Sequence, residues 1–101
     1  MFFKKFFKKK YNWRERITTQ ISCKEIEPKS GMKVICLAPA DGDETTINKK
    51  AEVYYDNKII GLIFDCIIDK GHDLAGHCKI GYGRYISFKQ WNDGDLKIIS
   101  K

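Results

Sequence analysis

The chain lacks the features that would assign it to a common functional class. No stretch approaches the roughly 20 apolar residues that a helix needs to cross a bilayer, and the basic N-terminus lacks the apolar run and small-residue cleavage site of a signal peptide. It has no nucleophile elbow, phosphate-binding loop or His-Glu zinc motif, and Gly81 and Gly83 do not open a helix as a dinucleotide fingerprint would. These absences predict a non-enzymatic cytoplasmic protein with no cofactor.

The cysteines show no paired spacing, and arginine is scarce. The cysteines Cys23, Cys36, Cys66 and Cys78 are widely spaced and form no Cys-x-x-Cys pair. Buried free thiols in a reducing compartment are therefore expected, with a single disulfide as the alternative. Three arginines stand against sixteen lysines. Because arginine reads guanine edges through forked hydrogen bonds, whereas lysine acts as a point charge, any nucleic-acid binding should be largely independent of base sequence.

What the chain has instead is a strongly asymmetric charge distribution. Residues 1–16 hold seven Lys or Arg against one acid, which equals the net charge of +6 of the whole chain, and residues 17–101 are balanced. A cationic arm on a neutral body predicts a negatively charged partner. If this polyanion is nucleic acid, bases would stack on Tyr11 and Trp13. The cations expected to contact phosphate are Lys4, Lys5, Lys8, Lys9, Lys10, Arg14 and Arg16.

The arm also has helical spacing. At about 100° per residue, one half of the circle contains Phe2, Phe3, Phe6, Phe7 and Tyr11, and most of the lysines fall opposite. The pattern predicts an amphipathic basic helix, and a helix this short is marginal in water without a surface to lie on. Four surfaces remain open: nucleic acid, a groove of a larger protein, an anionic membrane, and the protein's own domain.

Residues 17–101 change to a period of two, which predicts a small β domain. Tight turns are expected at residues 28–31, 56–57 and 92–94, an acidic loop at 39–46, and a short helix capped by Asp65. The expected fold is mainly β, an open barrel or bent sheet of five to six strands, SH3-like or OB-like. The expected strands are residues 17–26, 32–38, 51–55, 58–64, 79–91 and 96–100.

The segment from Gly81 to Phe88 resembles the aromatic strand of RNA-recognition and cold-shock domains, with Arg84 as an inserted residue. The resemblance implies that Tyr82, Arg84 and Phe88 form a platform on which bases stack. The insertion reverses the strand alternation, so Tyr82 and Tyr85 should point to opposite faces. The alternative is an ordinary glycine-bent strand with aromatic residues in the core.

A second resemblance covers about a third of the chain. It is carried by a glycine followed by a β run, by an Asn- and Asp-containing loop, and by an Ala-x-Val strand that turns into Ile-Gly. Together these loosely resemble the HIRAN domain, although Leu62 stands where that family usually has Tyr. The family is a small β-barrel that binds single-stranded DNA ends, so the resemblance implies nucleic-acid binding. The matching residues are 31–37, 48–51, Val53, Asp56, Lys58, Ile60, Gly61 and Ile63.

Two cysteines and two histidines lie within thirteen residues, as Cys66, His72, His77 and Cys78. Such a set has the ligand types of a tetrahedral zinc site, but the spacing matches no standard finger. The alternative is a pair of buried thiols with surface imidazoles. The same stretch holds the only candidate acid–base groups for catalysis, namely Asp69 and Asp73 beside the two histidines.

Overall fold

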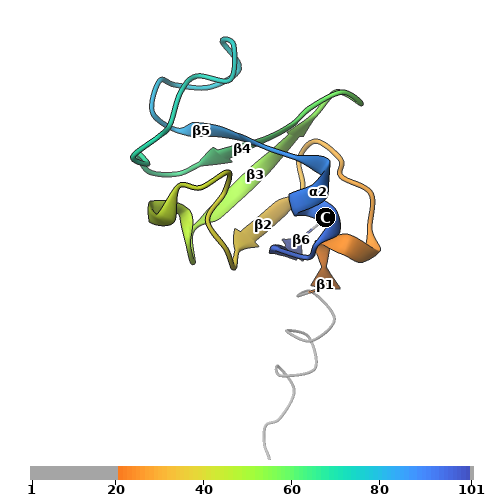
Figure 1. Ribbon diagram of the computed structural model, residues 1–101. Helices are drawn as coiled ribbons and strands as arrows, with labels where there is room; N and C mark the ends of the chain where they lie inside the picture. The colour runs from red at the N-terminus through yellow and green to blue at the C-terminus, as the bar shows by residue number, and fades with distance from the viewer. Residues whose placement is uncertain (1–20, 101) are drawn as a thin grey trace, which may run out of the picture.

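The computed structural model describes residues 21–100, so the arm and its predicted helix lie outside the described residues. The described chain is a six-stranded antiparallel sheet with one short α-helix (Figure 1). Its order is β1-β6-β2-β3-β4-β5, and the sheet is open, because the edge strands β1 and β5 do not pair with each other. The mainly β prediction is therefore confirmed. The strands are β1 (Ile21–Ser22), β2 (Lys33–Cys36), β3 (Lys50–Tyr55), β4 (Ile60–Phe64), β5 (Gly83–Ile86) and β6 (Leu96–Ser100).

The β3–β4 hairpin forms where the sequence predicts it. Tyr55 pairs with Ile60, and Asn57 adopts a left-handed conformation with a φ of 75°, which Asn tolerates better than most residues. The carboxylate of Asp56 accepts hydrogen bonds from the backbone N–H groups of Lys58 and Ile59 at 2.9 and 3.0 Å. These bonds lower the pKa of the Asp56 carboxyl. The turn is thus fixed by local chemistry.

Three predicted elements differ from the structure in extent or type. The strand expected at residues 17–26 ends at Ser22, where the 3₁₀ helix η1 (Cys23–Glu25) begins. Of residues 79–91 only β5 is a strand, because the Ser87 hydroxyl accepts a hydrogen bond from the N–H of Gln90 and caps the helix α2 (Phe88–Asn92). Residues 65–82, expected to start with a short helix, form a long loop. None of the helices in residues 21–100 is long and apolar enough to cross a membrane.

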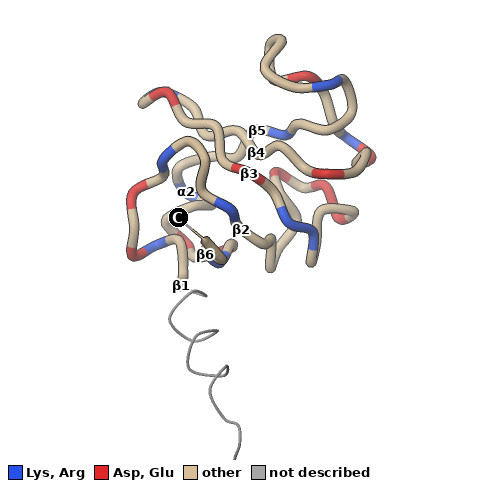
Figure 2. Tube along the Cα trace, turned by 180° about the vertical axis from the view of Figure 1, so that it is seen from behind, with Lys and Arg blue, Asp and Glu red and all other residues tan. Residues whose placement is uncertain are grey.

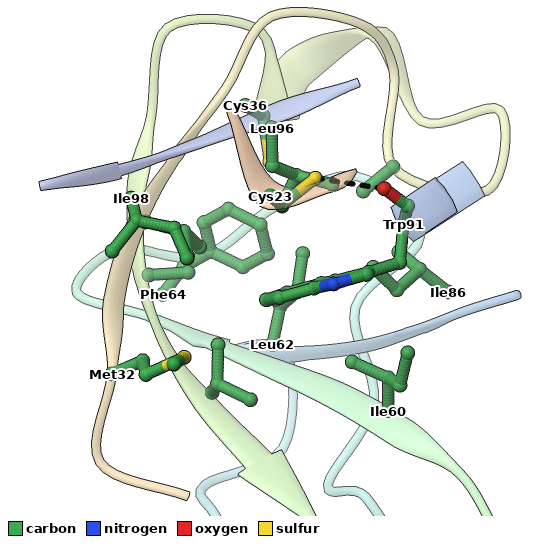
Figure 3. Packing of buried hydrophobic residues seen from close by; sticks show 14 of the residues in the cluster. Cys23, Met32, Cys36, Ile60, Leu62, Phe64, Ile86, Trp91, Leu96 and Ile98 are labelled. Carbon is green, nitrogen blue, oxygen red and sulfur yellow. Dashed lines mark hydrogen bonds between the residues drawn. The ribbon is translucent and has the colours of Figure 1, made fainter. Parts of the chain in front are cut away.

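The core lies between one face of the sheet and the α2 and η1 helices. Trp91 extends from α2 into the middle of the apolar cluster and is 1% exposed (Figure 3). Its indole N–H donates to the carbonyl oxygen of Ile26 at 2.8 Å, which satisfies the polar end of a buried ring. Because α2 follows β5 and η1 follows β1, contacts between these two helices connect the two edges of the sheet.

Residues 21–100 cover only part of the opposite, outer face of the sheet. The loop of residues 65–82 places Leu74 over β4 and β5, where it is fully buried. A Cβ atom at Gly61 would lie 2.9 Å from Leu74 Cδ1, and one at Gly83 would lie 2.5 Å from Leu74 Cγ. The two glycines therefore form a notch that accommodates Leu74, because any side chain at either position would occupy the same space. No comparable segment within residues 21–100 covers the outer face of β6, β2 and β3.

Candidate functional site

The uncovered part of the outer face contains a shallow groove of about 380 Å³. It crosses four strands: β2 and β3 contribute charged side chains, while β4 and β6 contribute isoleucines. The side chains that define it are Lys33, Lys50, Glu52, Ile63, Asp65 and Ile99.

Strand alternation and one irregularity place these side chains outward. In β3, Lys50 and Glu52 are exposed, whereas the residues between and after them are buried. Glu52 pairs with Lys33 on one side and with Ile63 on the other, so these three form a row across the sheet. The pairing of β2 with β6 shifts register between Lys33 and the next residue, which leaves Ile99 at a β-bulge. The groove therefore has an apolar floor, Ile63 and Ile99, between charged borders.

Both signs of charge border the groove, and Figure 2 shows basic and acidic positions side by side on β2 and β3. Lys33 Nζ lies 3.5 Å from the Glu52 carboxylate, with both side chains about half exposed. Such an exposed pair contributes about 0–1 kcal/mol. Ile35 pairs with Lys50 in β3 and with Lys97 in β6, so Lys33, Lys50 and Lys97 occupy one face. This arrangement suits non-covalent binding of an amphipathic or anionic segment.

Arg84, a predicted nucleic-acid contact, is used within the protein. Its guanidinium donates hydrogen bonds to the carbonyl oxygens of Ala40, Asp41 and Lys70. It also lies 3.1 Å from the Asp41 carboxylate, and its side chain is 16% exposed. Its position in β5 thus ties the loop after β2 to the loop after β4.

The two aromatic members of the predicted platform lie at opposite ends of β5. Tyr82 precedes the strand and is half-buried, whereas Phe88 follows it as the first residue of α2. Phe88 is 40% exposed and packs edge-on against Tyr55, with ring centroids 6.0 Å apart. A continuous strand from 79 to 91 would have been needed to put them on one strand face. The predicted arm contacts, from Lys4 to Arg16, lie outside the described residues.

The four candidate zinc ligands do not form a cluster. Within residues 21–100, no three His, Cys, Asp or Glu side chains gather in a way that would hold a metal ion. His72 Nδ1 accepts the backbone N–H of Leu74 at 3.0 Å, and His77 stacks on Tyr54 with centroids 4.1 Å apart. The Cys78 thiol donates to the His72 carbonyl oxygen at 3.7 Å. These groups hold the 65–82 loop on the sheet, and Cys66 joins none of these contacts.

All four cysteines are free thiols. Cys23 and Cys36 are buried, whereas Cys66 and Cys78 are half-buried. Burial raises the pKa of Cys36 to about 12 and also raises that of Cys78. Since the thiolate is the reactive form, these environments favour inert thiols.

Sequence reasoning missed a buried carboxylate, Asp43, which is 1% exposed. Its Oδ1 accepts the N–H of Thr45 at 2.9 Å and its Oδ2 accepts the N–H of Lys70 at 2.7 Å. Burial by itself raises the pKa of Asp43, but the hydrogen bonds from Thr45 and Lys70 outweigh it and lower the pKa. The Asp-x-Thr spacing was the available signal for the local bond, but nothing in the sequence indicated Lys70.

Comparison of the chain with protein-family models, with curated proteins and with solved structures finds no match. The resemblances to the HIRAN domain and to the RNA-recognition and cold-shock strand therefore stay predictions.

Proposed function

We propose that this protein is a non-enzymatic binding module for a polyanion, most readily nucleic acid, which it binds without sequence specificity through residues 1–16. The observation that carries the proposal is that the whole net charge of +6 resides in these sixteen residues, on a body that is neutral. Clustered lysines release counterions from phosphate backbones, and this gives affinity without base readout. The proposal includes the finer fold class, a barrel-like sheet of the SH3-like or OB-like kind.

The charged residues of the described body support the proposal that residues 1–16 are the main binding segment. Arg84 is the only arginine outside the arm. Its guanidinium already donates hydrogen bonds to three carbonyl oxygens and pairs with Asp41, so it is not available to a phosphate. The body's contribution would instead come from Lys33, Lys50 and Lys97 on the outer face. These lysines act as point charges, which again favours binding that ignores base sequence.

Salt-dependent binding of a labelled DNA duplex, followed by fluorescence anisotropy, tests the proposal. If seven cations contact phosphate, the logarithm of affinity should fall with the logarithm of salt concentration at a slope of about −6. A variant in which Lys4, Lys5, Lys8 and Lys9 are replaced by Gln should lose about 3 to 4 from the magnitude of that slope. Two duplexes of unrelated sequence should bind alike.

The matched control removes four exposed lysines of the body, Lys24, Lys29, Lys58 and Lys79, by the same substitution. It changes the net charge equally and should leave the slope nearly unchanged. A slope near zero, or equal losses in the two variants, would contradict the proposal. Binding to anionic vesicles with none to DNA would instead assign the arm to a membrane surface.

A second candidate function is docking on a larger protein. It is favoured by Ile67 and Ile80, which are 70% and 79% exposed. Ile67 lies against Gly81, since a Cβ there would be 3.4 Å from Ile67 Cγ2, so the two isoleucines occupy one region of the 65–82 loop. Contiguous exposed apolar side chains mark interaction sites more often than scattered ones do. Replacing both by Ser should weaken such a complex and leave DNA binding unchanged.

A further inference from the structure

We propose that the groove on the outer face seats the phenylalanine-bearing segment of the same chain, residues 2–7. This seat holds the arm's lysines on the face that carries Lys33, Lys50 and Lys97. The inference deepens the proposed function, and its use of those lysines rests on that function.

The chemistry of the groove fits this occupant. Its floor consists of two half-buried isoleucines, Ile63 and Ile99, which gain by apolar cover. Its borders carry Lys33 and Lys50 as well as Glu52 and Asp65. Lys33 pairs with Glu52, whereas Asp65 makes no ion pair with any residue in the 21–100 range. A segment that alternates phenylalanine doublets with lysine doublets offers rings to the floor and an ammonium group to Asp65 at the border, while its other lysines face outward.

The topology brings the arm to the correct side of the sheet. Ile21, the first described residue, pairs with Ile98, and the next residue of β6 is Ile99 on the groove floor. Because β1 runs antiparallel to β6, the N-terminal end of β1 points toward the Ile99 end of β6. The fourteen residue steps from Phe7 to Ile21 can span up to about 50 Å, so the linker is long enough for residues 2–7 to contact the groove.

Because the segment and the groove belong to one chain, even a weak interaction between them can be well populated. A segment tethered by a short linker faces its own groove at a local concentration in the millimolar range, well above that of a second molecule in ordinary solutions. The phenylalanine side then lies inward and the lysine side outward, as an amphipathic segment on a surface requires. The result is one continuous cationic face, built from the arm and from the sheet.

Nuclear magnetic resonance of the full chain, labelled at isoleucine methyl groups, tests the seat directly. The test variant replaces Phe2, Phe3, Phe6 and Phe7 by Leu, which keeps apolar bulk but removes aromatic ring currents. The δ-methyl signals of Ile63 and Ile99 should shift between wild type and variant. The signals of Ile80 and of the fully buried Ile60, neither of which lines the groove, should not move.

Unchanged Ile63 and Ile99 signals would overturn the proposal. If the differences between wild type and variant disappear when the protein is diluted, and sedimentation shows a dimer, the groove binds a second copy of the chain, which would also overturn it. A further variant, Ile63→Ser with Ile99→Ser, removes the apolar floor without changing the charge, so it should remove the seat and lower DNA affinity several-fold. If the methyl shifts appear but DNA does not bind, the proposed function fails and the seat stands. If DNA binds through the arm without those shifts, the seat fails and the function stands.

Discussion

The thiol of Cys23 donates a hydrogen bond to the carbonyl oxygen of Trp91 at 2.9 Å, across 68 positions of sequence (Figure 3). A second hydrogen bond joins the same two segments, because the indole N–H of Trp91 donates to the carbonyl oxygen of Ile26, just after η1. Both Cys23 and Trp91 are buried, so these bonds form away from water. They fix α2 against η1 and thereby join the two ends of an open sheet.

Truncation of Trp91 should therefore be severe. Trp91→Ala is expected to lower the free energy of unfolding by about 3–5 kcal/mol, because it empties the centre of the core and leaves the Ile26 carbonyl without its donor. Urea denaturation followed by circular dichroism measures the loss. Phe88→Ala, on the exposed side of the same helix, should cost much less. Equal costs would mean that α2 does not depend on Trp91.

The notch that holds Leu74 predicts a specific energetic coupling. Gly61→Ala should destabilise by about 1–3 kcal/mol, because the new Cβ meets the Leu74 side chain at 2.9 Å. In a Leu74→Ala background the same change should cost clearly less. Gly83→Ala should not be rescued in this way, since its Cβ would also meet Cys78 Sγ at 2.7 Å and the His72 carbonyl oxygen at 3.0 Å. A double-mutant cycle with additive costs would contradict the notch.

The buried Asp43 should contribute to acid sensitivity. Its pKa is lowered in the folded protein from the ordinary 3.8, so its contribution to stability is present above that value and is lost as the pH falls through the lower, folded pKa. The difference in unfolding free energy between wild type and Asp43→Asn should therefore shrink as the pH falls from about 5 toward 2. Asp69→Asn, which makes the same change at an exposed position, is the matched control.

The cysteines should differ in reactivity. At pH 8 the thiolate fraction of Cys36 is very small, since burial raises its pKa to about 12, and its side chain is covered. Iodoacetamide should label Cys66 in the native protein well before Cys36, and should label all four in urea. Peptide mass spectrometry after timed quenching measures this order. Native labelling of Cys36 as fast as Cys66 would show that this part of the core opens readily.

Local patterns predicted the elements that local chemistry controls. The β3–β4 hairpin follows from two alternating runs around Asp56 and Asn57, whose side chains and backbone preferences form the turn themselves. The last strand, Leu96–Ser100, begins soon after an Asn-Asp-Gly turn and matches its prediction. The helix α2 was missed because Ser87 was treated as one more strand position, although its hydroxyl caps a helix.

The candidate groove was not predictable from the sequence. Its floor depends on a register shift between β2 and β6 that leaves Ile99 without a partner in β2, and on strands that are distant in sequence lying side by side. The role of Arg84 was missed for a similar reason. Its guanidinium meets carbonyl groups more than forty residues away in the chain, at Ala40 and Asp41, and no local spacing indicates such partners.

By itself, the sequence determined the mainly β character, the hairpin turn and the separation of a cationic arm from a neutral body, because each depends on residue type and on neighbours within a few positions. The tertiary structure alone decided which side chains share a face, which charged groups are bonded within the protein, and which part of the sheet residues 21–100 leave exposed. Those properties arise from strand order and register, which are set by burying one common core and not by any single segment.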